Sequence, residues 1–300
     1  MHSLKQIKDR VRGITSTKKI TQAMKVVASA KLKNAQESLK KSNNYLKAIC
    51  NTLLDINMID ATLLQSSLCI NHKSDSNKVL YVLIGSDKGL CGAFNYKIAD
   101  SIQNDIHYNK NIRLFCIGNK IAQCIIDSQH KNYVIKKIPM FKKDSKRISY
   151  SNTLLLSKEI RNIIYNDDFY QCKIIFTNFD SISKSTVHNI SLLPLEISKL
   201  NKLLDMSQVN ESDNNRFFSY EEDLEDMFKR IIIKYIDAFF FYAYCSSLTC
   251  EYSSRMLSMD NATQNSQKML KELSLLYNKG RQDIVTKELI EIISGAESIT

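Results

Sequence analysis

The fold of this 300-residue chain is decided by residues 219–295, which read SYEEDLEDMFKRIIIKYIDAFFFYAYCSSLTCEYSSRMLSMDNATQNSQKMLKELSLLYNKGRQDIVTKELIEIISG. Ser219 and, three residues later, Glu222 form a capping box, a typical helix start. No proline follows, and the first glycine is Gly280. Apolar residues then recur at three- and four-residue steps: Leu224, Phe228, Ile231, Tyr235, Phe239, Tyr242, Tyr252, Met256, Met259, Met269, Leu273, Leu276, Ile284, Leu289 and Ile292. The pattern predicts one helix on the order of 110 Å long, at 1.5 Å per residue.

A helix of this length needs a partner, because it cannot bury its apolar stripe within its own domain. The start of the chain supplies a candidate. Ser3 and Gln6 form a second capping box, and a narrow stripe follows. Its members are Leu4, Ile7, Val11, Ile14, Met24, Ala28, Leu32, Ala35, Leu39, Leu46, Ile49, Leu53 and Ile56. We therefore predict that an N-terminal helix over residues 1–57 and a C-terminal helix over 219–298 form an antiparallel coiled coil.

Residues 76–197, between the two helices, predict a Rossmann-like α/β domain. KVLYVLIG, residues 78–85, is a continuous apolar run typical of a fully buried strand. Further strands are expected at 112–118, 133–138, 173–179 and, as an edge strand ending near Pro194, 187–195. Helices are expected at 94–107, 120–128 and 152–165. This alternation predicts a mainly parallel sheet, and residues 198–218 read as a polar linker.

Composition and charge limit the classes of protein that fit. No apolar run is expected to reach the length of a membrane span, and the start of the chain is polar and helical, unlike a secretory signal. Eight cysteines without a C-x-x-C pair indicate buried thiols in a reducing compartment. The net charge is +11, and residues 1–54 carry 12 Lys and Arg against Asp9 and Glu37. A helix this basic indicates an acidic partner, a nucleic acid or a membrane surface, and is less simply explained as a solvated face.

Two classes of function fit this architecture: an enzyme or nucleotide binder, and a mechanical protein built around a two-helix shaft. For the first, the turn Gly85–Gly92, GSDKGLCG, lies where α/β folds bind phosphates, but it matches neither common phosphate-binding motif. We expect a tight turn there. No histidine is placed to activate Cys91, and no histidine pair has metal-ligand spacing. The sequence therefore predicts no catalytic, cofactor-binding or metal-binding residues.

Three separated blocks resemble the gamma subunit of rotary F-type ATP synthases. They are SLKQIKDRVRGITSTKKITQAMKVVASAKLKNAQ at 3–36, GSDKGLCGAFN at 85–95, and SSRMLSMDNATQNSQKMLKELSLLYNKGRQDIVTKELIEIISGAESI at 253–299. They occur in the family's order and span nearly the whole chain, although residues 120–218 diverge too far for comparison residue by residue. The first and last blocks are highly specific.

The resemblance implies a non-catalytic subunit: the central rotor shaft that couples proton flow through a membrane ring to ATP synthesis or hydrolysis in an alpha–beta head. It implies as partners the alpha and beta subunits, an epsilon-type subunit and the membrane c-subunit ring, with no nucleic acid and no small-molecule substrate. It also implies a peripheral location on the cytoplasmic side of a bacterial inner membrane. Six residues match partner contacts of the family: Met24 and Lys25 near the beta hinge loop, Arg281 and Gln282 in a catch, and Ile292 and Ile293 in an apolar bearing.

The sequence departs from the family pattern at two places, and one alternative function also fits it. Gly280 stands where a larger residue is expected, and glycine costs about 1 kcal/mol inside a helix, so the shaft is expected to be softer there. The cluster Phe239–Tyr242 is bulkier than expected, and packing against the α/β domain is its simplest explanation. The alternative function is a nucleic-acid-associated coiled-coil protein with a central hinge domain, whose basic N-terminus would bind phosphates.

Overall fold

The computed structural model describes residues 4–59, 78–108, 111–128, 130–140, 150–167, 169–195 and 224–297. The expected caps Ser3 and Ser219 and the expected linker at 198–218 lie outside these residues. The chain divides into two compact units. We call residues 4–30 with 255–297 the coiled-coil unit, and residues 31–254 the α/β unit.

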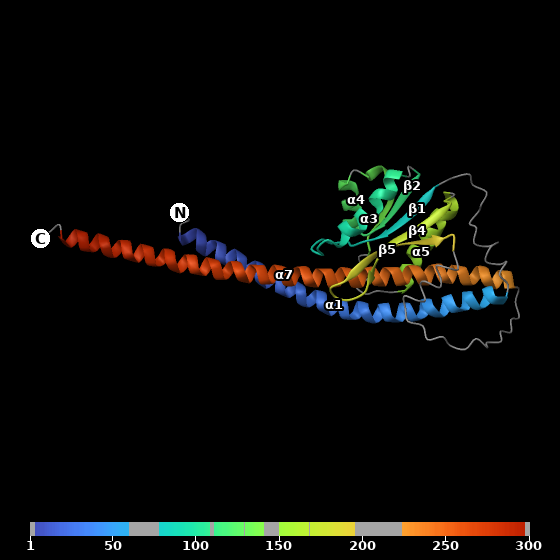
Figure 1. Cartoon of the computed structure of the whole chain (residues 1–300), viewed down its shortest axis with the longest axis horizontal. Helices are drawn as coiled ribbons and strands as arrows, with labels where there is room; N and C mark the ends of the chain where they lie inside the picture. Colours follow the sequence, from blue (N-terminus) through green and yellow to red (C-terminus); the bar gives the residue numbers. More distant parts are fainter. Residues whose placement is uncertain are drawn as a thin grey trace. The chain divides into compact units, whose positions relative to one another are not determined.

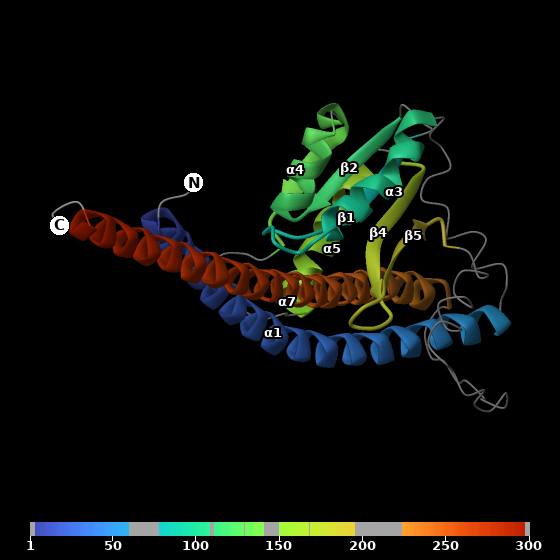
Figure 2. The same cartoon turned by 60° about the vertical axis from the view of Figure 1, so that its left-hand side comes forward.

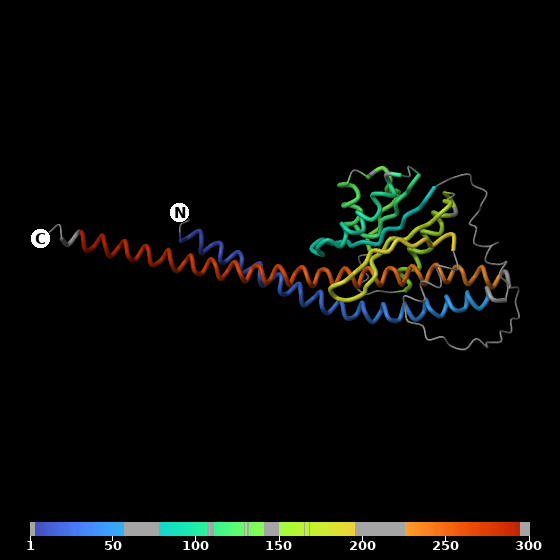
Figure 3. Tube along the Cα trace, viewed as in Figure 1, coloured from blue at the N-terminus to red at the C-terminus, as the bar shows by residue number. Residues whose placement is uncertain are grey.

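Two long helices run through both units. Helix α1 spans Leu4–Ile59 and helix α7 spans Leu224–Glu297, and both are continuous (Figures 1 and 3). Gly13 and the threonines after it do not interrupt α1, and within the helix the hydroxyls of Thr15 and Thr17 donate to carbonyl oxygens four residues earlier. The expected fold class, long terminal helices flanking a central α/β domain, is confirmed.

The α/β unit contains a five-stranded sheet in the order β3-β2-β1-β4-β5. The strands are β1 (Val79–Ile84), β2 (Ile112–Ile117), β3 (Val134–Ile138), β4 (Gln171–Phe179) and β5 (Ser185–Leu193). β1 to β4 are parallel, and β5 pairs antiparallel to β4 at one edge, directly before Pro194, as the sequence predicts. All six residues of β1 are buried, which explains its continuous apolar run.

The sheet lies between two layers of helices (Figure 2). Helices α3 (Phe94–Tyr108) and α4 (Asn119–Asp127) cover one face, where Tyr81, Leu83 and Leu114 pack with Ile98 and Ile121. Helix α5 (Tyr150–Asn166) and the first part of α7 cover the other face. There Phe239 and Tyr242 pack edge-on against Phe176 of β4. The aromatic cluster therefore belongs to the core, in agreement with its simplest sequence explanation.

Side chains of α7 complete the hydrogen bonding of β4. β1 pairs with β4 only as far as Leu83 and Ile175, so the last residues of β4 lack a strand on that side. The hydroxyl of Ser247 accepts from the Thr177 amide (3.1 Å), and that of Ser246 accepts from the Phe179 amide (3.2 Å) and donates to the Thr177 carbonyl (3.0 Å). Because buried backbone groups need partners, these hydroxyls replace a neighbouring strand.

Helix α7 also contains a segment long and apolar enough to pass a membrane-span test, contrary to the sequence expectation. Its most apolar window has a mean hydropathy of 1.3 and is 72% buried within the structure. The segment is apolar because it is a core helix of the α/β unit, where residues such as Ala238, Phe239 and Cys245 have no exposed surface.

Candidate functional site on the paired helices

All six predicted contact residues lie in the coiled-coil unit, where α1 and α7 pack side by side (Figure 1). Three contacts define how the helices pair. Leu4 approaches Gly280, Thr21 bonds to Thr263, and Lys25 bonds to Asp260. As the residue number rises along α1 it falls along α7, so the pairing is antiparallel, as predicted.

The same contacts give the register, which the sequence alone did not. On α1 the seam residues repeat with a heptad spacing, and on α7 they do so from Met259 to Gly280. The α1 series in this unit is Leu4, Ile7, Val11, Ile14, Lys18, Thr21, Lys25 and Ala28; the α7 series is Met259, Thr263, Ser266, Leu270, Leu273, Tyr277 and Gly280. The centre of the seam is therefore polar.

Between Leu4 and Ala28 of α1 and between Met259 and Gly280 of α7, three residues expected on the apolar stripes lie outside the seam. Met24, Met269 and Leu276 are exposed, and their places are taken by Thr21 and Lys25 on α1 and by Ser266 and Leu270 on α7. The cause is the heptad repeat. Residues spaced 3.5 positions apart on average face the partner helix whatever their chemistry, and in this seam some of those residues are polar. Beyond Gly280, the expected stripe residues Ile284, Leu289 and Ile292 are exposed as well.

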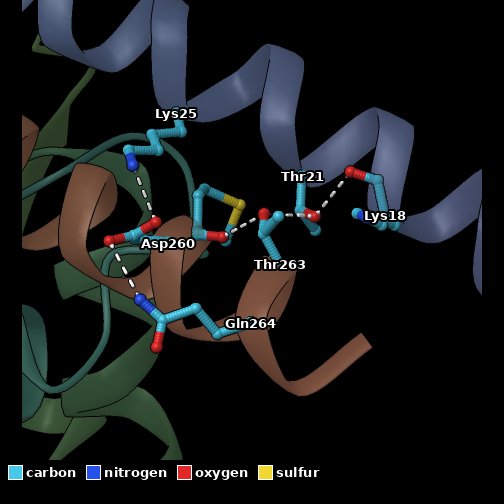
Figure 4. Close-up of polar contacts among 7 residues, drawn as sticks. Lys18, Thr21, Lys25, Asp260, Thr263 and Gln264 are labelled. Carbon is cyan, nitrogen blue, oxygen red and sulfur yellow. Dashed lines mark hydrogen bonds and ion pairs between the residues drawn. The ribbon is translucent and has the colours of Figure 1, made fainter. Parts of the chain in front are cut away.

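Lys25 donates from Nζ to Oδ1 of Asp260 at 2.7 Å, and the two side chains are 42% and 32% exposed (Figure 4). Asp260 also accepts, at its other oxygen, from the amide of Gln264 on the next turn of α7. One turn along α1, the hydroxyls of Thr21 and Thr263 lie 2.8 Å apart. Figure 4 shows these contacts as one polar layer across the helix pair.

Met24 lies beside this layer in an exposed apolar strip. Ile20, Met24 and Val27 follow one another at i, i+4 and i+7, so they share a face of α1. Exposed apolar patches of this kind mark interaction surfaces. Met24 was predicted from the sequence as a contact residue and Ile20 and Val27 were not, although their i, i+4 and i+7 spacing is visible in the sequence.

Arg281 and Gln282 are exposed on α7, directly after Gly280. A Cβ atom on Gly280 would lie 3.1 Å from Cδ2 of Leu4, closer than an ordinary van der Waals contact. Glycine at this position therefore lets the start of α1 approach α7 closely. Gly280 therefore has a packing role that could not be predicted from the sequence.

Beyond Gly280 the surface of α7 becomes more apolar. Ile292 and Ile293 are 67% and 58% exposed, and Leu289 and Ile290 are also exposed. A groove of about 710 Å³ precedes them, between the helices, with apolar walls that include Leu4, Ile7 and Ile284. A helix that is apolar on several faces needs cover from another surface.

The turn after β1 is built for packing. A Cβ atom on Gly85 would lie 2.3 Å from Cβ of Ile121, so this glycine is required by the close approach of α4. The Asp87 carboxylate accepts from the backbone amides of Asn119 (3.0 Å) and Met140 (2.9 Å). Asn119 begins α4, so the chain's own carboxylate occupies the helix N-terminus that would otherwise attract a phosphate.

Other candidate chemistry near this turn also has a structural explanation. The Cys91 thiol is buried between the Ser86 hydroxyl, the Asn95 amide and the Lys88 carbonyl. Within the part of the chain that the structure describes, no three His, Cys, Asp or Glu side chains gather as metal ligands do.

Comparisons with known proteins agree with the resemblance of the three blocks. A family model described as ATP synthase matches residues 3–299. Proteins named ATP synthase gamma chain from Rickettsia canadensis and Pelagibacter ubique are 32% and 31% identical over the full length of both chains. The protein of that name from Acetivibrio thermocellus is 30% identical, also over the full length.

Solved structures share the fold. A chain from the Euglena gracilis mitochondrial ATP synthase, in a structure of OSCP, F1 and the c-ring, aligns over 99% of this chain and 94% of its own length, with a TM-score of 0.67 and 15% identity. A chain from the central stalk and c-ring of the Tetrahymena thermophila enzyme aligns over 81% of this chain and 99% of its own, with a TM-score of 0.57 and 22% identity.

Proposed function

This chain belongs to the gamma-chain family of ATP synthases, and we propose that its residues build the central rotor shaft of such a complex. The shaft couples proton flow through a membrane ring to ATP synthesis or hydrolysis in an alpha–beta head. The observation that carries the proposal is the antiparallel pairing of α1 and α7, two helices of 56 and 74 residues, in a chain that matches the family from end to end.

The exposed surfaces of the coiled-coil unit fit a surrounding protein sleeve. We assign the strip Ile20, Met24 and Val27 to contact with the head near a beta hinge loop. Ile292 and Ile293, exposed near the end of α7, suit an apolar bearing that permits rotation because no hydrogen bond has to break as the surfaces slide. The basic surface of α1 suits acidic loops of the head.

Arg281 and Gln282 form the proposed catch with loops of alpha and beta. The Arg281 guanidinium presents a planar fork suited to a carboxylate, and the Gln282 amide offers a donor and an acceptor. Both are exposed in this chain, so their contribution arises only when a partner removes them from water.

We propose that the subunit itself is not catalytic and holds no cofactor. Asp87 supports this proposal, because a phosphate at the start of α4 would have to displace the carboxylate that already bonds to Asn119 and Met140. The α/β unit is assigned instead to an epsilon-type subunit and the c-subunit ring. We further place the complex on the cytoplasmic side of a bacterial inner membrane, where this subunit is peripheral. The nucleic-acid alternative has no support among the similar proteins.

Reconstitution of the chain with alpha and beta subunits tests the function. We expect a stable complex with rotary ATPase activity, and failure to assemble would contradict the proposal. Within the complex, Arg281→Ala with Gln282→Ala should lower ATP-driven proton pumping without unfolding the subunit, because losing one partner of a desolvated charge pair costs about 2–5 kcal/mol. Lys271→Ala with Glu272→Ala, an exposed pair elsewhere on α7, is the matched control. Pumping equal to wild type in the Arg281 and Gln282 variant would refute the catch.

A further inference from the structure

We propose that Lys25, Asp260, Thr21 and Thr263 form a register pin: a polar layer that fixes the axial offset of α1 against α7. The two hydrogen bonds of the pin join side chains that are 235 and 242 residues apart in sequence. Thr21 and Lys25 occupy successive seam positions of α1, and Thr263 occupies a seam position of α7, with Asp260 on the turn before it.

The apolar heptad seam of the coiled-coil unit does not by itself select one register, so the pin adds to the constraint from the buried second half of α1, which includes Ala35 and Leu53. Sliding one helix by a heptad, about 10 Å at 1.5 Å per residue, brings leucine and isoleucine knobs into equivalent holes. The same slide separates the Lys25 ammonium from the Asp260 carboxylate and the Thr21 hydroxyl from that of Thr263. A polar residue at a seam position is known to specify register in this way, at a cost in stability.

Stability alone does not explain the pair. An ion pair as exposed as Lys25 and Asp260 adds only about 0–1 kcal/mol to the free energy of unfolding. Thr21 is nevertheless buried, and its hydroxyl bonds both to Thr263 and to the Lys18 carbonyl. A role in fixing the register explains polar residues at these positions better than a contribution to the free energy of unfolding does.

The effect of the register pin on contacts with the head rests on the proposed rotor function. The proposed contacts of Met24 lie on α1, whereas those of Arg281 and Gln282 lie on α7. The head meets both sets in the correct places only when the offset of the two helices is fixed. We therefore assign Lys25 to its intramolecular partner Asp260, as a positioning residue, and leave the contact with the head to Ile20, Met24 and Val27.

A charge swap tests the pin in the assembled complex. Lys25→Asp and Asp260→Lys each place like charges together and should lower ATP-driven proton pumping per ATP hydrolysed by about threefold or more, within the coupling range of contacting residues. The double swap restores opposite charges and should recover most of the loss. If Lys25 instead contacts the head directly, the double variant will be as impaired as the Lys25→Asp variant, which overturns the pin. Asp9→Asn, which removes an exposed ion pair with Arg12 within α1, is the matched control.

A second measurement needs no partner subunits, so it separates the pin from the rotor proposal. Spin labels on Arg12→Cys and Glu272→Cys, both exposed in this chain, report the offset of the helices. The background carries Cys69→Ser, because Cys69 lies outside the described residues, whereas the seven described cysteines are buried. We expect one narrow distance distribution without other changes. Adding Lys25→Leu with Asp260→Leu should produce a second population at a longer distance, because a slide of one heptad, about 10 Å along the axis, moves the two opposed labels out of register, while the melting temperature stays equal or rises. A single unshifted distance, or a lower melting temperature without a second population, would overturn the proposal.

Discussion

Helix α7 lies in two very different environments along its length. From Tyr235 to Ser253 most of its side chains are buried, including polar Ser246, Ser247 and Thr249. From residue 264 to residue 294 most are exposed, including Leu275 and Ile292. In the α/β unit the helix is held by packing and hydrogen bonds on several sides, and in the coiled-coil unit by one seam. The same helix therefore serves as a core element in one unit and as a surface for partners in the other.

A proline in the exposed half of α7 should give the largest difference between the two units, because it should disrupt the coiled-coil unit and leave the α/β unit folded. Leu273 is a half-buried seam residue of α7. Leu273→Pro removes a backbone hydrogen bond and clashes with the preceding turn, at a local cost of about 3 kcal/mol or more. We expect the α/β unit to stay folded by near-ultraviolet circular dichroism, whereas proton pumping by the complex is lost.

Leu273→Met is the control, because it conserves volume and should cost less than about 1.5 kcal/mol. A proline variant that pumps protons as well as wild type would show that the exposed half of α7 does not transmit rotation.

Removing a buried charge should affect the other unit. Asp237 of α7 pairs with Arg161 of α5, with side chains only 10% and 12% exposed, and also accepts from the Ser157 hydroxyl at 2.5 Å. Asp237→Ala leaves the guanidinium buried without its counter-charge, so we expect a loss of about 3–5 kcal/mol in the free energy of unfolding. Urea denaturation of the purified chain measures this loss.

Asp226→Ala provides the comparison, because it removes the exposed ion pair with Lys229 on the same helix. Its expected cost is about 0–1 kcal/mol. Equal effects of the two substitutions would contradict the contrast between a buried and an exposed pair.

The reactivity of the cysteines tests how tightly the α/β unit is packed, and it is the smallest of the expected effects. Of the described cysteines, all seven are buried free thiols in the α/β unit. Burial raises the pKa of Cys50, Cys116, Cys172 and Cys245 to about 12, so only about one thiol in ten thousand is ionised at pH 8. The thiolate is the reactive form, so these four should resist iodoacetamide in the native chain and react after denaturation, as read by mass spectrometry. Rapid native labelling of any of them would contradict the described packing.

Much of the fold could be predicted because its signals are local. The run KVLYVLIG predicted β1, and Pro194 predicted the end of an edge strand, since each depends only on neighbouring residues. The register could not be predicted, because the partners of Thr21 and Lys25 lie more than 200 residues away. Met24 and Met269 were predicted on the stripe because they are apolar. In the structure, the heptad spacing places Thr21 and Ser266 at the seam positions instead.

The six candidate contacts were found through family blocks, and the structure adds what those blocks do not contain. It shows that Lys25 already has a partner, that Gly280 makes room for Leu4, and that Ile20 and Val27 extend the surface of Met24. Each of these depends on which face of a helix meets which neighbour, and sequence spacing decides that only once the register is known.

The hydroxyls that complete β4 also impose an order on synthesis. Thr177 leaves the ribosome 70 residues before Ser247, which accepts its amide hydrogen bond. At about 5–20 residues per second, the end of β4 waits roughly 4–14 s for its last partner. During that interval the sheet presents an unfinished edge to the cell, one that another chain's strand could pair with. Completion of β4 therefore depends on α7, which follows β4 and β5 in the chain.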